Sequence, residues 1–162
     1  MKIRHMQPGD IAAVQGTARR TWAHTYDGII PEEIQKKFLD LAYSDASLAR
    51  RMESDIFLVA EDAGEVVGFA DFQSVSKAAA YLGALYVLPD HQRLGIGTRL
   101  FETGLTEFPP SVGIMLRVER HNARARRFYE AHGFRITGET TEDLFGHESH
   151  EIEMIRDPRK TP

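Results

Sequence analysis

The chain has 162 residues, of which 42% are hydrophobic and 27% charged, values typical of a globular protein with one domain, residues 1–162. Its formal net charge of −4 gives no general attraction to nucleic acid or to an anionic membrane. The absence of cysteine excludes disulfides, a thiol nucleophile and thiolate metal sites, and fits a cytoplasmic location. The apolar run 78–88 is too short to cross a membrane, and residues 1–10 lack the apolar segment of a signal peptide.

The first third of the chain predicts a short strand followed by helices. Pro8 and Asp10 are typical of a helix start, and apolar residues then recur at helical spacing. Ser44 or Asp45 is a suitable N-cap for a later helix. We expect, in order, a strand at 3–6 and helices at 8–22, 31–43 and 44–54.

From residue 55 the pattern changes to strands. Ala63 and Gly64 indicate a hairpin, and Pro89 ends a strand because proline cannot extend a central ladder. Asn122 suits a helix N-cap and Gly133 the position after a helix. We expect strands at 55–62, 65–73 and 80–88, a helix at 95–107, a strand at 112–119, a helix at 122–132, and strands at 134–139 and 149–157 around a polar loop. This order predicts a mixed α/β sandwich with helices on both faces of a central sheet.

Two glycines, Gly95 and Gly97, stand where the helix at 95–107 begins. A phosphate-binding Walker loop requires a lysine directly after the second glycine, and none follows Gly97. The dinucleotide fingerprint requires a third glycine at the position of Leu100. Both familiar glycine motifs are therefore absent.

A helix start still has unpaired N–H groups and a partial positive charge. Small residues there let an anion approach the backbone, so a phosphate or diphosphate is the natural ligand. The alternative is a simple junction between loop and helix, in which the glycines only ease the turn. The glycine pair alone leaves both interpretations open.

Two segments in order carry a family resemblance. The first is LYVLPDHQRLGIGTRL, with the spacing Gln92-x-x-Gly95-x-Gly97. The second is the helix from Asn122 to Phe134, NARARRFYEAHGF, with its Phe-Tyr-Glu triplet. Together they resemble the GNAT superfamily of acyl-CoA-dependent N-acetyltransferases, and the length and predicted topology agree over nearly the whole chain. The resemblance implies a mostly antiparallel sheet whose fourth and fifth strands, 80–88 and 112–119, splay apart around acetyl-CoA.

The resemblance also implies roles for individual residues. Tyr129 would be the general acid that protonates the departing sulfur, and the backbone N–H of Val87 would stabilise the oxyanion. The alternative for Tyr129 is an aromatic side chain that only packs in the core. The implied acetyl-CoA contacts are Leu85, Tyr86, Val87, Gln92, Arg93, Leu94, Gly95, Ile96, Gly97, Thr98, Asn122 and Tyr129.

The general base is left open. Many relatives carry a glutamate on the fourth strand, whereas this chain has Gly83 and Ala84 there. An amine with a pKa near about 10 is mostly protonated at neutral pH, so some group must accept a proton. The substitutes are a water chain or one of four side chains, Asp71, Glu119, His24 and His121.

The stretch 21–33, TWAHTYDGIIPEE, resembles the acceptor region of spermidine-type polyamine acetyltransferases. Trp22 and Tyr26 would form an aromatic wall of the acceptor site, so we expect a small-molecule amine or polyamine as acceptor. Amino acids, antibiotics and protein N-termini stay open. No metal site is expected, because HESH at 147–150 is not the zinc motif His-Glu-x-x-His.

Two rival functions are kept beside the enzyme. The first is a non-catalytic acyl-CoA-binding sensor, which the missing fourth-strand glutamate favours and Tyr129 opposes. The second is a nucleotide-binding regulator that contacts DNA through the arginines of 117–127, which the acidic balance opposes. We expect no nucleic-acid partner and no membrane partner. A homodimer is left open, since many relatives are dimers.

Overall fold

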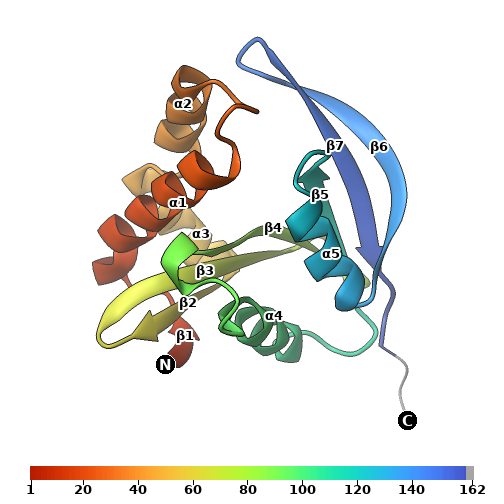
Figure 1. Ribbon diagram of the computed structural model, residues 1–162. Helices are drawn as coiled ribbons and strands as arrows, with labels where there is room; N and C mark the ends of the chain where they lie inside the picture. The colour runs from red at the N-terminus through yellow and green to blue at the C-terminus, as the bar shows by residue number, and fades with distance from the viewer. Residues whose placement is uncertain (160–162) are drawn as a thin grey trace.

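A computed structural model, which describes residues 1–159, contains a seven-stranded sheet with helices on both faces (Figure 1). The strands are β1 (Lys2–His5), β2 (Ile56–Asp62), β3 (Glu65–Ser74), β4 (Ala79–Val87), β5 (Gly113–Glu119), β6 (Phe134–Leu144) and β7 (His147–Arg156). The helices are α1 (Ile11–Thr25), α2 (Glu32–Ala42), α3 (Asp45–Ser54), α4 (Ile96–Thr106) and α5 (Ala123–Ala131), with short 3₁₀ turns η1 (Pro8–Asp10) and η2 (Pro89–His91).

The strand order is β1-β2-β3-β4-β5-β7-β6. Neighbouring strands are antiparallel except β4 and β5, which are parallel. Helices α4 and α5 cover one face of the sheet, and α1, α2 and α3 cover the other. The predicted fold class, a mixed and mostly antiparallel α/β sandwich, is confirmed.

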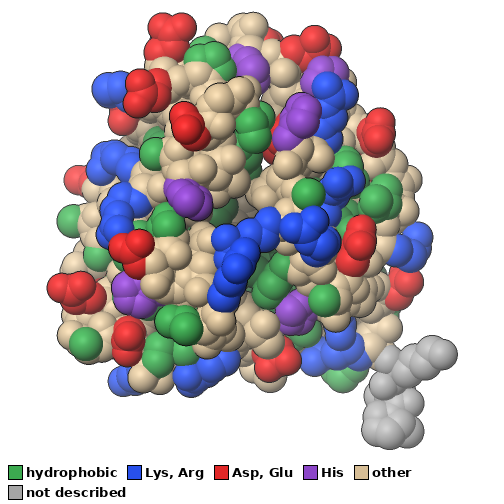
Figure 2. Space-filling view, viewed as in Figure 1, with side chains coloured by type: hydrophobic (Ala, Val, Ile, Leu, Met, Phe, Trp, Pro, Cys, Tyr) green, Lys and Arg blue, Asp and Glu red, His purple; other side chains and the backbone are tan. Residues whose placement is uncertain are grey.

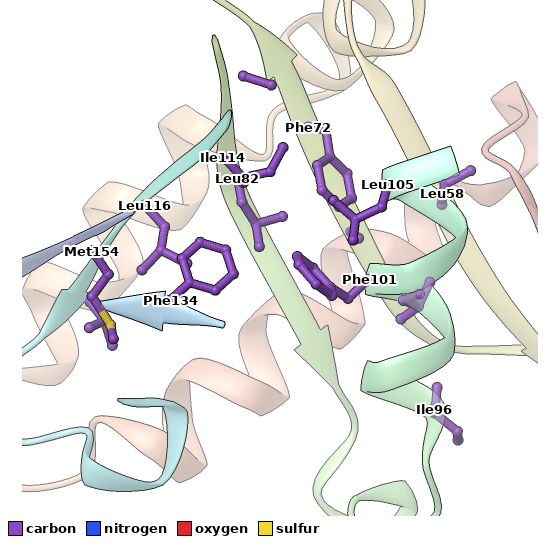
Figure 3. Packing of buried hydrophobic residues seen from close by; sticks show 14 of the residues in the cluster. Leu58, Phe72, Leu82, Ile96, Phe101, Leu105, Ile114, Leu116, Phe134 and Met154 are labelled. Atoms are coloured by element: carbon purple, nitrogen blue, oxygen red, sulfur yellow. The ribbon is translucent and has the colours of Figure 1, made fainter. Parts of the chain in front are cut away.

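Each face of the sheet has its own hydrophobic core. On the α4 side, Phe72, Phe101 and Phe134 come together with aliphatic residues of β4, β5 and β7 (Figure 3). On the α1 side, Trp22 and Phe69 anchor a second cluster. The alternating residues of β5 that the sequence places on one face are all buried in the first core, as predicted: Val112, Ile114, Leu116 and Val118.

The local signals that set the element ends are present in the structure. The side chain of Ser44 accepts from the Ser47 N–H at 3.1 Å, and that of Asn122 accepts from the Ala125 N–H at 3.2 Å, so both predicted N-caps are confirmed. Ala63 and Gly64 both have positive φ, as the tight turn between β2 and β3 requires. Helix α1 continues three residues beyond the predicted end at Trp22.

The prediction of a polar loop between the last two strands is wrong. Strand β6 continues to Leu144 and β7 begins at His147, so the segment 140–148 forms a long hairpin. Its turn is Phe145–Gly146, both with positive φ. The outer half of the hairpin is mostly exposed and polar on both faces, which removes the alternation that marks a half-buried strand.

Strands β4 and β5 separate soon after they meet. They pair over three positions, from Ala79 opposite Gly113 to Tyr81 opposite Met115. Beyond this point β4 pairs only with β3, and a bulge at Gly83 interrupts that pairing, since Asp71 lies opposite Ala84 and Phe72 opposite Leu82. The predicted splay of the fourth and fifth strands is confirmed. Separately, none of the helices within residues 1–159 combines the length and the apolarity needed to cross a membrane.

Gly104 on α4 offers a test of the packing between this helix and the sheet. A Cβ at Gly104 would overlap the ring of Phe72, which is fully buried. We expect Gly104→Ala to lower the free energy of unfolding by about 1–3 kcal/mol, the usual cost of overpacking a core. Chemical denaturation measures the change.

Gly16, inside α1, is the matched control. A Cβ there meets nothing within 4 Å, so Gly16→Ala should leave stability unchanged or raise it by up to about 1 kcal/mol through helix propensity. Equal effects of the two substitutions would contradict the tight contact at Gly104.

Candidate active site

A cavity of about 610 Å³ opens where β4 and β5 separate. This volume is in the range of small-molecule sites. Its floor is β4, one wall is α1, the opposite wall is α5, and its lower end is the start of α4. The cleft is therefore built from both halves of the chain.

The edge of β4 that faces the cleft carries free backbone groups. The Leu88 N–H donates to the Val67 carbonyl of β3 at 2.8 Å. Successive N–H groups on a strand point in opposite directions, so the N–H groups of Val87 and Leu85 point away from β3 and into the gap. The Val87 carbonyl, on the same side, accepts from the Gln92 side chain at 2.9 Å. The cleft thus presents a strand edge that an extended ligand can pair with.

The loop before α4 turns backbone N–H groups toward the cleft. Arg93 and Gly95 both have positive φ, at 66° and 80°. The first hydrogen bond that closes a helical turn runs from the Arg99 N–H to the Gly95 carbonyl at 3.1 Å, so the N–H groups of the first turn, including Gly97 and Thr98, have no helical acceptor. With the helix dipole, they form a site suited to an anion.

Positive side chains strengthen this end of the cleft. Arg93 and Arg124 line this end, whereas Arg117 lines the cleft from β5, where it pairs with Glu153. In Figure 2 the blue side chains of Lys and Arg cross the middle of the displayed face beside the hollow. Phosphate groups are therefore favoured at the α4 end.

Tyr129 lies on the α5 wall. Its ring packs edge-on against Phe134, with centroids 5.4 Å apart, and it also lines the cleft. Burial raises the pKa of its hydroxyl, and the neighbouring hydroxyls of Tyr86 and Tyr81 raise it further. The packing role and the cleft position are thus both real, and the phenol holds its proton at neutral pH.

Aromatic residues form the α1 wall. Trp22 stacks on Phe38 at 4.5 Å between ring centroids and donates from Nε1 to the Tyr86 hydroxyl at 3.0 Å. Tyr26 contacts Trp22 edge-on at 4.7 Å. The pKa of Tyr26 is raised by burial and then by Tyr86, so this hydroxyl also stays neutral. The predicted aromatic pair lines the cleft, although Trp22 is almost fully buried.

The structure brings the predicted acetyl-CoA contacts together around this cleft, with one exception. Leu94 is 69% exposed and is not among the lining residues. The residues that do line it are Leu85, Tyr86, Val87, Gln92, Arg93, Gly95, Ile96, Gly97, Thr98, Asn122 and Tyr129.

The four candidate bases fall in different environments. Asp71, on β3 opposite Ala84 of β4, is completely buried and accepts from Arg51 at 2.8 Å. Burial together with Asp55 raises its pKa to about 7. Glu119 is 8% exposed and accepts two hydrogen bonds from His121, one from the backbone and one from the ring, both at 2.7 Å. Of these four residues, all within the described range 1–159, His24 alone lines the cleft.

A group of carboxylates on β5, β6 and β7 lies outside the residues that line the cleft. Burial raises the pKa of Glu151 to about 7, and repulsion by Glu142 adds to the shift. Glu119 and Glu151 lie opposite each other on β5 and β7, and the charge of Glu151 also acts on the hydroxyl of Tyr81. Arg117, which lines the cleft, lowers the pKa of Glu151 in turn, and Glu119 acts on the hydroxyl of Tyr26 in the cleft wall.

The sequence interpretation missed some lining residues. Thr21 is one of them. Its hydroxyl is buried and has no hydrogen-bond partner within the described residues. His91, Arg124 and Phe128 also line the cleft. The sequence signal for Thr21 is helical spacing: Thr21 and Thr25 are four residues apart, so both lie on the same face of α1, and both line the cleft.

Comparison with known proteins identifies the family. The model of the acetyltransferase (GNAT) family matches residues 19–134. The chain is 30% identical over 144 residues to the uncharacterized N-acetyltransferase YhfO of Bacillus subtilis, a match that covers 83% of this chain and 89% of the relative. It is 27% identical to the spermidine N(1)-acetyltransferase of Thermoplasma acidophilum, over 93% of this chain and 98% of that protein.

The fold agrees with solved structures as well. The crystal structure of PaiA N-acetyltransferase from Thermoplasma acidophilum, in complex with coenzyme A, superposes with a TM-score of 0.81. It shares 24% identity, and the match covers 96% of this chain and 98% of that one. Among residues 1–159, no group of three or more His, Asp or Glu side chains is arranged to hold a metal ion. The chain belongs to the GNAT family and is an acyl-CoA-dependent N-acetyltransferase with acetyl-CoA as its co-substrate.

Proposed function

We propose that this enzyme acetylates a small primary amine of the polyamine class by direct transfer within a ternary complex. The observation that carries the proposal is the arrangement of one cleft: free N–H groups and arginines at the α4 end, Tyr129 on the α5 wall, and an aromatic α1 wall whose Tyr26 feels the charge of Glu119. The similarity to a spermidine N(1)-acetyltransferase supports the acceptor class.

The nucleotide end of acetyl-CoA is assigned to the start of α4. The N–H groups from Arg93 to Thr98 would receive the diphosphate, and the absence of a side chain at Gly97 keeps the approach open. The pantetheine arm would then run along β4 and pair with the free backbone of Leu85 and Val87. Since Gln92 already occupies the Val87 carbonyl, the Val87 N–H is the group left for the thioester end.

The chemistry needs one oxyanion donor and one acid. The amine nitrogen forms a bond to the thioester carbonyl carbon, and the Val87 N–H stabilises the negative oxygen, a contribution of about 3–4 kcal/mol per donor in other enzymes. The carbon–sulfur bond then breaks, and Tyr129 gives its proton to the sulfur. The proton released by the amine passes to water or to a group such as His24, which lines the cleft.

The acceptor would enter beside the aromatic α1 wall. Trp22 and Tyr26 supply aromatic faces that suit a cation and its methylene chain. Glu119, Glu142 and Glu151 supply negative potential for a second ammonium group. A polyamine carries both features, one amine to be acetylated and another to be held.

A screen for thiol release tests the proposal. Acetyl-CoA is incubated with polyamines, amino acids and aminoglycosides, and free thiol and acetylated product are measured. We expect turnover with spermidine-like amines and little with neutral amino acids. Tight binding of acetyl-CoA without turnover of any amine would instead support the non-catalytic sensor.

The role of Gly97 can be tested by adding a side chain. A Cβ at this position would lie 3.6 Å from the Phe128 ring, an ordinary contact, so the fold tolerates it. Gly97→Val should weaken coenzyme A binding at least about tenfold, the loss of roughly 1.4 kcal/mol, because the methyl groups obstruct the diphosphate. Calorimetry measures the affinity, and Gly16→Val on α1 is the control. Unchanged affinity in Gly97→Val would refute the diphosphate assignment.

Removal of one hydroxyl tests Tyr129. Tyr129→Phe keeps the contact with Phe134 and deletes the proposed acid. We expect kcat to fall about 100-fold, the lower range for a general acid, while the Kd for acetyl-CoA changes little. Near-normal turnover would show that this ring only packs.

Glu151 predicts a pH dependence of acceptor binding. Its pKa of about 7 means that the carboxyl is neutral at lower pH and ionised at higher pH, so its attraction for a cation grows as pH rises. Glu151→Gln should raise the KM for spermidine about three- to fivefold at pH 8 and hardly at pH 6, the range for a partly exposed ion pair.

Comparison at each pH cancels the titration of the amine itself. Glu148→Gln, an exposed position on the same strand, is the matched control. A KM ratio between Glu151→Gln and wild type that is the same at both pH values would contradict the role of this carboxyl.

A further inference from the structure

One hydrogen-bonded chain links the start of α4 to the end of α5. The Thr98 hydroxyl lies 3.2 Å from Nε2 of His132, and Nδ1 of His132 lies 2.8 Å from the Phe128 carbonyl oxygen. Thr98 lines the cleft at the proposed diphosphate site, and His132 is the residue that ends α5. The contact was not expected from the sequence.

The partners decide which atoms carry protons. A carbonyl oxygen can only accept, so Nδ1 of His132 must carry a hydrogen. In the neutral imidazole, Nε2 then has none and is an acceptor. The Thr98 hydroxyl must therefore donate its single proton to Nε2, which leaves its oxygen lone pairs to face the cleft.

The surroundings hold the ring in this position. Phe128 lies beside the imidazole with centroids 4.2 Å apart, and Phe101 of α4 meets it edge-on at 5.4 Å. Within residues 1–159 the hydrogen-bond partners of the ring are Thr98 and the Phe128 carbonyl.

One charged side chain reaches the backbone of His132, and others are its neighbours in sequence or those of Thr98 and Phe101. From β7, Arg156 donates to the backbone carbonyl of His132 at 3.0 Å. On the helices that pack around the ring, the charged neighbours in sequence are Arg99 and Glu102 of α4 and Arg127 and Glu130 of α5. None of these forms an ion pair with the imidazole in the described part of the chain.

A phosphate oxygen at Thr98 creates a conflict, because both it and Nε2 need the same proton. We propose that His132 is a positioning residue for the diphosphate: protonation of its imidazole reverses the Thr98 hydrogen bond and releases the hydroxyl proton to the phosphate. This inference rests on the proposed function, which assigns the diphosphate to this loop. It adds a residue on α5 that touches no ligand and acts through Thr98.

The direction of the pH effect follows from linkage. Imidazolium donates from both nitrogens, so Nε2–H bonds to the Thr98 oxygen and the hydroxyl points to the phosphate. Protonation and diphosphate binding then favour each other, so affinity rises as pH falls. In a neutral site the ligand must instead break the Thr98–His132 bond.

The probe is 3′-dephospho-coenzyme A. It retains the diphosphate and lacks the 3′-phosphate, which itself titrates near about pH 6. Calorimetry measures its Kd from about pH 8 to about pH 5.5, the range in which histidine titrates. The variants are Thr98→Val, His132→Phe and the pair together, with His147→Asn as the control because His147 is a histidine outside the residues that line the cleft.

Between about pH 8 and about pH 5.5 the affinity of each protein for the probe changes by some factor. We expect this gain in affinity to be about fivefold larger in wild type than in either single variant, a coupling at the lower end for linked sites. Thr98→Val and His132→Phe should show the same reduced pH dependence of Kd, the double variant should show no further reduction, and His147→Asn should show the wild-type pH dependence. In NMR titrations the midpoint of the His132 ring signal should rise when the probe is added to wild type and stay fixed in Thr98→Val.

Three outcomes would overturn the inference. An equal pH dependence of Kd in wild type and Thr98→Val would show that the phosphate and Nε2 of His132 do not compete for the Thr98 hydroxyl proton. A loss of affinity in His132→Phe that is constant with pH and matches a loss of thermal stability would show a merely structural contact. Absence of binding by wild type at every pH would refute the diphosphate site and the proposed function with it, a result distinct from the first two.

Discussion

Beyond the pair of Tyr81 with Met115, the parallel strands β4 and β5 exchange no further hydrogen bonds, and this separation determines the rest of the site. A strand edge inside a protein is costly, since each buried polar group without a partner costs about 1–3 kcal/mol. The gap persists because α4 and α5 on one face and α1 on the other hold the strands apart through two distinct cores. A ligand with amide groups can satisfy the edge that the protein leaves open, so the same constraint defines both the fold and its co-substrate.

The cleft is also electrically polarised along its length. One end combines the dipole of α4 with Arg93 and Arg124, whereas the aromatic wall away from α4 feels the charge of Glu119, which acts on Tyr26. An anionic co-substrate and a cationic acceptor would therefore enter from opposite ends and meet in the middle. There the tyrosine hydroxyls lie in a partly buried environment that keeps them protonated. Phosphate binding, proton donation and recognition of the amine would thus each take place in a different part of the same cleft.

The sequence predicted the features that depend on short-range signals. The caps at Ser44 and Asn122, the turn at Ala63–Gly64 and the buried face of β5 all follow from neighbouring residues. It failed where the decisive partner lies far along the chain. The hairpin of β6 and β7 is stabilised by a ladder of backbone bonds rather than by an apolar face, so its outer half lacks a periodic signal. The contact of Thr98 with His132 joins positions 34 residues apart. The burial of the Thr21 hydroxyl likewise depends on tertiary packing and cannot be predicted from the neighbours of Thr21 in the sequence.

The missing carboxylate on β4 has a counterpart on the neighbouring strand β3. Asp71 stands opposite Ala84, but it is fully buried, bonded to Arg51 and raised in pKa by burial, so its charge serves the core and not the cleft. A second carboxylate at Ala84 would stand beside Asp71 on the same face of the sheet and bring like charges close together, at a cost in low dielectric. Under the proposed mechanism the amine proton leaves instead through the open side of the cleft, where His24 is in contact with solvent. Arrangement of the two substrates, rather than a dedicated base on β4, would then carry most of the catalysis.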